Sequence, residues 1–147
     1  MIKVHILQVD TQPVNVAEFE ESLAIGHTVD EAHGWEMPKN AEPGDLVVWY
    51  AAGRSEFVAR GWVEDHPHPG TRNGHPSYMG PVVGMQRIKA VHRMTVKDSC
   101  GVDGGHQGYQ TVRETVVGEF LLALKFPRRF VSASELISAE VAAILRK

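Results

Sequence analysis

The stretch that decides the fold is Glu42-Pro43-Gly44-Asp45-Leu46-Val47-Val48-Trp49-Tyr50-Ala51, followed after a short gap by Glu56-Phe57-Val58-Ala59-Arg60-Gly61-Trp62-Val63. Its first four residues are typical of a turn, because proline, glycine and aspartate favour turn conformations. The residues that follow are aliphatic, β-branched or aromatic, which is typical of a strand. A second turn through Gly53 leads to another such run. The sequence therefore predicts an antiparallel hairpin with strands over 46–50 and 56–63.

Further elements are expected on both sides of this hairpin. Residues 3–9 alternate weakly and are rich in valine, isoleucine and leucine, which predicts a first strand. Asn15 and Glu18 form a capping-box pattern at the start of a short amphipathic helix over 15–25. Beyond the hairpin, residues 64–80 are so rich in proline and glycine that we expect a loop without regular structure.

The second half of the chain is expected to contain three more strands and a final helix. The predicted strands cover residues 82–96, 111–117 and 119–126. Helix stays an alternative within the first of them, where Ile88, Val91 and Met94 follow one another at three-residue spacing. A glycine-rich loop is expected over 99–110. A second capping box, which starts at Ser132, begins a terminal amphipathic helix.

These elements predict an α+β fold. Five or six strands with helices at the edges, and no strand–helix–strand alternation, favour a small, mostly antiparallel β-barrel or curled sheet with short flanking helices. A chain of 147 residues is long enough for one hydrophobic core and short for two. We therefore expect residues 1–147 to form a single domain.

The composition is that of an ordinary globular protein, with 43% hydrophobic and 22% charged residues. No apolar run approaches the roughly 18 residues that a membrane span needs, and the first residues lack the pattern of a secretory signal. The single cysteine, Cys100, has no second cysteine with which to form an internal disulfide. We expect a cytoplasmic protein that does not enter a membrane.

Charge is distributed unevenly along the chain, although the net charge is only −3. Residues 1–65 contain 4 basic and 12 acidic residues, whereas residues 66–97 contain 5 basic residues and no acidic one. Such a local cationic segment can bind a few phosphates on a protein that is acidic as a whole. We therefore predict phosphate contacts at Arg87, Lys89 and Arg93. The alternative is that strands and loops merely place their acidic residues elsewhere.

Metal and nucleophile chemistry find little support in the sequence. Several histidines lie in the proline-rich loop 66–76, but no carboxylate between residues 66 and 97 is present to support a metal site there. Cys100 and His106 lie in a glycine-rich segment, where nothing fixes the geometry that a nucleophile and its base require. No glycine motif of a nucleotide cofactor site opens a helix after a strand. We expect no catalytic residue, no metal and no cofactor.

Aromatic residues gather in the first half of the chain, close to the predicted hairpin. They are Trp35, Trp49, Tyr50, Trp62 and Tyr78. Ring faces suit a planar or cationic guest, and the alternative is that individual rings fill the core. Because neighbours on a strand point to opposite faces, Trp49 and Tyr50 cannot both point inward. We expect at least two of these rings to line a pocket, and one of this neighbouring pair to face a groove, a loop or a partner.

The stretch over residues 43–63 resembles the EVE domain of the PUA-like superfamily. That family has a glycine–aspartate turn, a strand that ends in an aromatic and a small residue, and a strand that runs through glycine into valine. The upstream Trp35 and the segment Phe130-Val131-Ser132-Ala133-Ser134-Glu135 before a closing helix are similar in layout. The resemblance implies a PUA-like β-barrel with short flanking helices. The loops over 66–76 and 99–110 depart from the family, and either of them would reshape or cover a pocket.

The resemblance implies a binding module rather than an enzyme. EVE domains are similar to YTH domains, which bind a modified base in an aromatic pocket. The implied partner is a DNA or RNA that carries a modified or flipped base. The implied pocket residues are Trp35, Trp49, Tyr50 and Trp62, with Tyr78 added from the following loop.

Two other functions stay open. The related ASCH group includes amidohydrolases of modified nucleosides and has a GxKxxExR-like motif. The corresponding segment of this chain, residues 84–89, lacks the acidic residue of that motif. A hydrolase would then need Asp45 or Glu64 as the general base. The second alternative is a protein-interaction module, such as a dimer, whose exposed aromatic residues contact a protein and bind no nucleic acid.

Overall fold

The computed structural model describes residues 3–9, 12–24, 34–72, 74–104 and 109–126. The strands are β1 (Val4–Val9), β2 (Trp35–Glu36), β3 (Leu46–Ala51), β4 (Glu56–Val63), β5 (His68–Arg72), β6 (His75–Gly80), β7 (Val82–His92) and β8 (Tyr109–Thr111). The helices are α1 (Pro13–Ala24), α2 (Arg93–Cys100), the short 3-10 helix η1 (Glu114–Val116) and α3 (Val117–Ala123). The terminal helix that begins at Ser132 in the sequence-based prediction lies outside the described residues.

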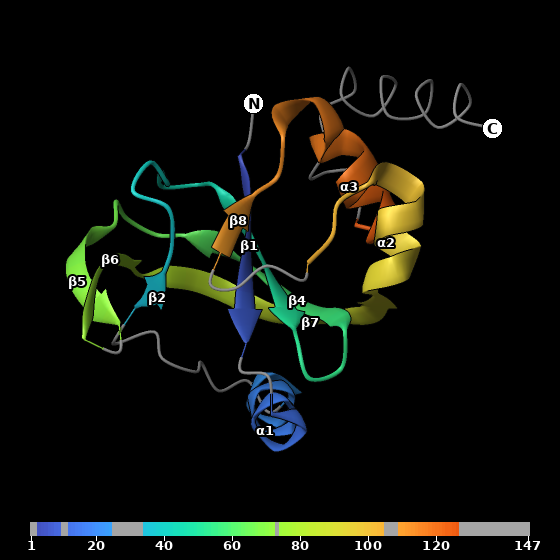
Figure 1. The fold of residues 1–147 in the computed structure, drawn as a ribbon, viewed down its shortest axis with the longest axis horizontal. Helices are drawn as coiled ribbons and strands as arrows, with labels where there is room; N and C mark the ends of the chain where they lie inside the picture. Colours follow the sequence, from blue (N-terminus) through green and yellow to red (C-terminus); the bar gives the residue numbers. More distant parts are fainter. Residues whose placement is uncertain (1–2, 10–11, 25–33, 73, 105–108, 127–147) are drawn as a thin grey trace.

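The strands form two sheets, which Figure 1 shows side by side. The larger has five strands in the order β7-β4-β3-β1-β8, and the smaller has three in the order β2-β6-β5. The predicted hairpin is confirmed, since β3 and β4 pair in antiparallel fashion. β1 pairs with β3 in parallel, with α1 on the connection between them. The expectation of no strand–helix–strand unit is therefore wrong here, and within the described residues the sheets are not closed into a barrel.

Both faces of the five-stranded sheet are covered. On one face, residues of α2 and α3 pack on the sheet and form the first core, which includes Tyr50, Phe57, Val96, Phe120 and Leu124. On the other face, α1 and the chain around β2 form the second core, which includes Leu7, Val16, Phe19, Met37 and Trp49. Figure 1 shows α1 on the opposite side of the sheet from α2 and α3. All six residues of β3 are buried, because this central strand has a core on each side.

The loop expected over 64–80 is instead a hairpin of β5 and β6. Arg72 pairs with His75, so the connection has two residues, and Gly74 has a φ of 79°. An Asn-Gly pair at 73–74 is a strong signal for such a turn. Two prolines are tolerated because β5 is an edge strand and Pro76 lies on the part of β6 that β2 does not cover.

In the second half, the end of one predicted strand and most of another are helical. The strand expected over 82–96 ends at His92, where α2 begins with a hydrogen bond from the Met94 N–H to the His92 side chain. The strand expected over 119–126 lies mostly in α3. Its buried residues Val117, Phe120, Leu121 and Leu124 follow the i, i+3, i+4, i+7 spacing of a helix. The strand expected over 111–117 is reduced to the end of β8, followed by η1.

Candidate functional site

Three aromatic rings meet in the second core, on the α1 side of the sheet. The centroids of the Trp35 and Trp49 rings lie 5.4 Å apart with an edge-to-face arrangement. Phe19 of α1 lies 5.9 Å from the Trp35 ring and 6.0 Å from the Trp49 ring. Gly61 on β4 leaves room for this arrangement, because a Cβ atom there would lie 3.0 Å from two atoms of the Trp49 ring. The structure thus brings together two of the predicted pocket residues, Trp35 and Trp49.

The two indole N–H groups of this cluster are unusual. Nε1 of Trp35 and Nε1 of Trp49 are both buried, and neither has a hydrogen-bond partner in the described part of the chain. A buried donor without a partner costs about 1–3 kcal/mol, so native structures contain few of them. The second core therefore contains two such donors, on rings that contact each other edge to face.

Tyr50 lies on the opposite face of the sheet from Trp49. It is 3% exposed and belongs to the first core, where its ring centroid is 5.3 Å from that of Phe57. The expectation that Trp49 or Tyr50 must face a groove, a loop or a partner is wrong, because each face of β3 is covered by its own core. The predicted alternation along the strand is confirmed, since Trp49 and Tyr50 lie in different cores.

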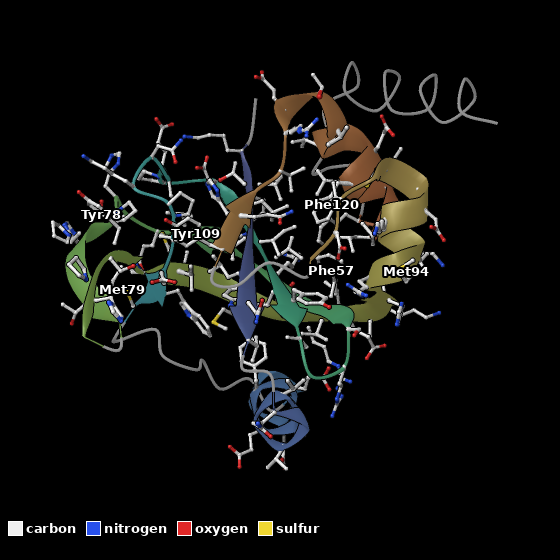
Figure 2. The ribbon with its side chains drawn as sticks, viewed as in Figure 1. Phe57, Tyr78, Met79, Met94, Tyr109 and Phe120 are labelled. Carbon is white, nitrogen blue, oxygen red and sulfur yellow. The ribbon has the colours of Figure 1, made fainter. Side chains whose placement is uncertain are left out.

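Trp62 and Tyr78 lie in two further places. Trp62 is half-buried and packs against the first core, with its Cδ1 3.1 Å from the position of a Cβ atom on Gly84. Tyr78 lies on β6 of the smaller sheet, and Lys39 Nζ is 5.6 Å from the centroid of its ring. Tyr78 and Tyr109 line a pocket of about 550 Å³; both are labelled in Figure 2.

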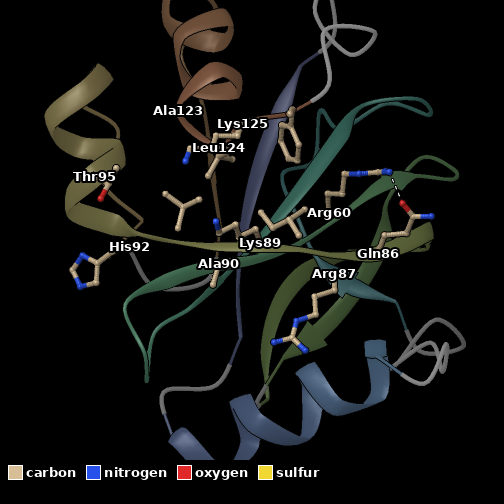
Figure 3. A pocket seen from close by; sticks show the side chains of 13 residues that line it. Arg60, Gln86, Arg87, Lys89, Ala90, His92, Thr95, Ala123, Leu124 and Lys125 are labelled. Carbon is tan, nitrogen blue, oxygen red and sulfur yellow. Dashed lines mark hydrogen bonds between the residues drawn. The ribbon is translucent and has the colours of Figure 1, made fainter.

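A cationic groove of about 560 Å³ runs along β7 between α2 and the end of α3. Figure 3 shows the side chains that line it. They are Arg60, Gln86, Arg87, Ile88, Lys89, Ala90, Val91, His92, Thr95, Ala123, Leu124, Lys125 and Phe126. Four of these residues are arginine or lysine, and none is acidic. The predicted residues Arg87 and Lys89 both line the groove, whereas the local charge count missed Arg60 and Lys125 because they come from other segments.

The predicted phosphate-contacting residues differ in their partners. Arg93 is not among the residues that line the groove. Its Nη1 lies 3.3 Å from Asp103 Oδ1. Arg87 Nη2 lies 3.9 Å from a carboxylate oxygen of Glu20, and Figure 3 shows its side chain directed toward α1. Arg60 donates a hydrogen bond from Nη2 to Gln86 Oε1. Arg60, Lys89 and Lys125 therefore form the cationic part of the groove, with Arg87 at its rim.

Other candidate chemistry has a more limited place in the structure. Across the described ranges, no three His, Cys, Asp or Glu side chains are grouped so that they could hold a metal ion. Cys100 is buried, and its Sγ donates to the Val96 carbonyl oxygen at 3.3 Å. Its possible partner His106 lies outside the described residues. No helix in the part of the chain that the structure describes is long and apolar enough to cross a membrane.

Comparison with known proteins gives structural similarity without sequence similarity. No family model and no curated protein matches the sequence. The structure is similar to a mutant form of the protein ZmASCH from Zymomonas mobilis, with a TM-score of 0.54, 10% identity and coverage of 84% of this chain and 96% of that one. It is similar to Rpa0253 from Rhodopseudomonas palustris, with a TM-score of 0.53, 16% identity and coverage of 84% and 92%. A weaker similarity, with a TM-score of 0.44 and 7% identity, covers 85% of this chain and 88% of the YTH domain of the Zygosaccharomyces rouxii MRB1 protein, solved in complex with N6-methyladenosine RNA.

These similarities concern the fold. The prediction of a mixed α+β fold is confirmed, and the ZmASCH structure shares this fold; the predicted closure into a barrel is not seen among the described residues. Identities of 10% and 16% define the architecture and leave the activity to the residues of this chain.

Proposed function

We propose that this protein is a nucleobase-binding module of the PUA-like fold, similar to EVE domains, which recognises a modified or flipped base in DNA or RNA. The observation that carries the proposal is the pair of buried indole N–H groups on Trp35 and Trp49, which have no hydrogen-bond partner among the described residues. A base supplies what this site lacks, because its edge carries carbonyl oxygens and ring nitrogens that accept hydrogen bonds. A protein that only needed to fill its core would gain more from Phe or Leu at these positions.

The energetics of such binding are consistent with the cluster. Stacking of a base on an aromatic side chain contributes about 1–3 kcal/mol. Extrusion of a base from a duplex costs a few kcal/mol, and the cost is lowest for a damaged, mismatched or single-stranded base. Two hydrogen bonds to buried donors would offset much of that cost, because the donors lose no water when the base arrives.

The residues have unequal parts in this proposal. Trp35 is half-buried, whereas Trp49 is fully buried. A guest therefore reaches the Trp35 ring with a smaller movement of the surrounding side chains than the Trp49 ring requires. Tyr50 and Trp62 pack on the opposite face of the sheet, so the proposal rests on Trp35 and Trp49. Arg87 and Lys89 are proposed to contact the phosphates that flank the base.

The test is a binding titration with short single-stranded oligonucleotides that contain unmodified cytosine or adenine, methylated or hydroxymethylated cytosine, or methylated adenine. We expect saturable binding, measured by the anisotropy of a labelled oligonucleotide, with a preference for one modified base at fixed salt. Trp35→Phe keeps a ring but removes the donor, and we expect it to weaken binding about tenfold. Trp62→Phe makes the same chemical change in the first core and should leave the affinity within about twofold. No saturable binding to any oligonucleotide, or equal affinities for both variants and the unaltered protein, would contradict the proposal.

A further inference from the structure

Three cations of the groove come from segments that are distant in the sequence. Arg60 lies on β4, Lys89 on β7 and Lys125 two residues after the end of α3. Between them the floor is apolar, with Ile88, Val91 and Leu124 among the lining residues. Cationic groups that line one groove create a local positive potential, which attracts an anion.

The backbone at Lys125 provides a second, independent observation. Lys125 has a φ of 58°, in the left-handed region where glycine is favoured. It occupies the position after the end of α3 that normally holds glycine: its N–H donates to the Leu122 carbonyl at 3.0 Å, and the next N–H donates to the Leu121 carbonyl at 3.1 Å. Lysine adopts this conformation less readily than glycine does, and the Lys125 side chain lines the groove (Figure 3).

From these two observations we infer that the groove extends the proposed phosphate contacts into a binding site for the phosphodiester backbone of a single-stranded nucleic acid, with Lys125 as the residue that contributes most specifically to it. Phosphate oxygens accept hydrogen bonds from the guanidinium of Arg60 and the ammonium groups of Lys89 and Lys125. The apolar floor suits the carbon atoms of the sugars between the phosphates. This inference rests on the proposed function, since it takes the groove to bind the strand on which the recognised base lies.

The groove can be tested without any base. The probe is a labelled abasic oligonucleotide, a chain of deoxyribose and phosphate, and its binding is measured at several salt concentrations. Three cations on single-stranded nucleic acid predict a slope of about −2 for the logarithm of the binding constant against the logarithm of the salt concentration. Lys125→Gly should weaken binding about five- to tenfold and reduce the slope by about 0.7. Lys125→Arg keeps the charge and should keep the affinity.

The matched control is Arg113→Ala. Arg113 is exposed, lies in the turn after β8 and does not line the groove, so its loss lowers the net charge equally without changing the site. We expect its effect to stay below about twofold. Equal effects of Lys125→Gly and Arg113→Ala, or no binding of the abasic chain to the unaltered protein, would overturn the inference.

Two further comparisons separate this inference from its basis. If the abasic chain and base-containing oligonucleotides bind equally and Trp35→Phe changes neither, the proposed base recognition fails, whereas the groove as a phosphate site still stands through its own variants. If a mononucleotide binds as tightly as the abasic chain and loses the same affinity in Lys125→Gly, the occupant is a single phosphate group, and the assignment to a strand is overturned.

Discussion

His5 and Asp45 form a buried pair, in which Nε2 of the imidazole lies 2.9 Å from Oδ2 of the carboxylate. The other ring nitrogen, Nδ1, lies 2.9 Å from the hydroxyl of Thr111. Lys3 Nζ is 3.8 Å from the same carboxylate oxygen, which also accepts the Glu42 N–H. The pair therefore joins β1 to β8 and to the turn before β3. Asp45, a candidate general base in the hydrolase hypothesis, is occupied by this structural contact.

Stability should depend on pH through His5. Burial, partly opposed by Asp45, lowers the pKa of His5 from its ordinary value of 6.5. Between the lowered pKa and 6.5, the unfolded chain binds more protons than the folded one, so the free energy of unfolding falls as the pH falls below 6.5. The contribution of one proton is at most about 1.4 kcal/mol per pH unit. Urea unfolding between pH 7.5 and 5 measures it, and His5→Gln should reduce this slope; the same slope in both proteins would contradict the assignment.

Replacement of Trp35 by phenylalanine should separate binding from stability. The indole N–H of Trp35 has no partner within the described residues, so its removal breaks no hydrogen bond there. We expect the free energy of unfolding to change by less than about 1.5 kcal/mol, which is typical of a modest change of volume. Phe57→Leu, at a fully buried ring of the first core, should cost about 1–3 kcal/mol and leave base affinity unchanged. A large loss of stability in Trp35→Phe would instead indicate a structural role for the indole.

The hairpin of β3 and β4 was predictable because its signals are local. Turn residues and two apolar runs lie within 22 residues, and β-branched side chains fix the type of element. The same local signals were present for α3, in the spacing of its buried residues, and for β5 and β6, in the Asn-Gly pair. In these two segments the apolar content and the proline content favour a different structure from the one that residue spacing and turn chemistry favour, and the structure follows the spacing and the turn chemistry.

The candidate site depends on contacts that no local pattern contains. Arg60, Lys89 and Lys125 share a groove only because β4, β7 and the end of α3 meet in space. Strand alternation predicts only that Trp49 and Tyr50 point in opposite directions. The layers that cover β3 decide whether each ring lies in a pocket or in a core. The charge count over 66–97 located one wall of the groove correctly and placed Arg93 in it, whereas the structure pairs Arg93 with Asp103.

Gly104 should not tolerate a larger residue. A Cβ atom at this position would lie 2.6 Å from Cδ2 of Tyr50 and 3.0 Å from Cζ of Phe57, inside the first core. Both rings are buried and cannot move away freely. We expect Gly104→Ala to lower the free energy of unfolding by about 1–3 kcal/mol. Urea unfolding measures the loss, and Tyr50→Leu in the same chain should recover part of it; an unchanged unfolding midpoint in Gly104→Ala would contradict the packing described here.

Lys125→Gly should stabilise the protein while it weakens oligonucleotide binding. Lys125 and Ser55 are the two described residues other than glycine with positive φ, at 58° and 57°. Glycine relieves the strain at either position, and we expect each change to raise the free energy of unfolding by about 1 kcal/mol. Ser55 lies in the turn between β3 and β4 and does not line the groove, so Ser55→Gly is the matched control, with an unchanged affinity for the abasic chain. If Lys125→Gly raises stability and weakens binding, whereas Ser55→Gly only raises stability, the charge of Lys125 serves binding at the expense of a strained backbone. A loss of stability in Lys125→Gly would show that the lysine side chain stabilises the fold instead.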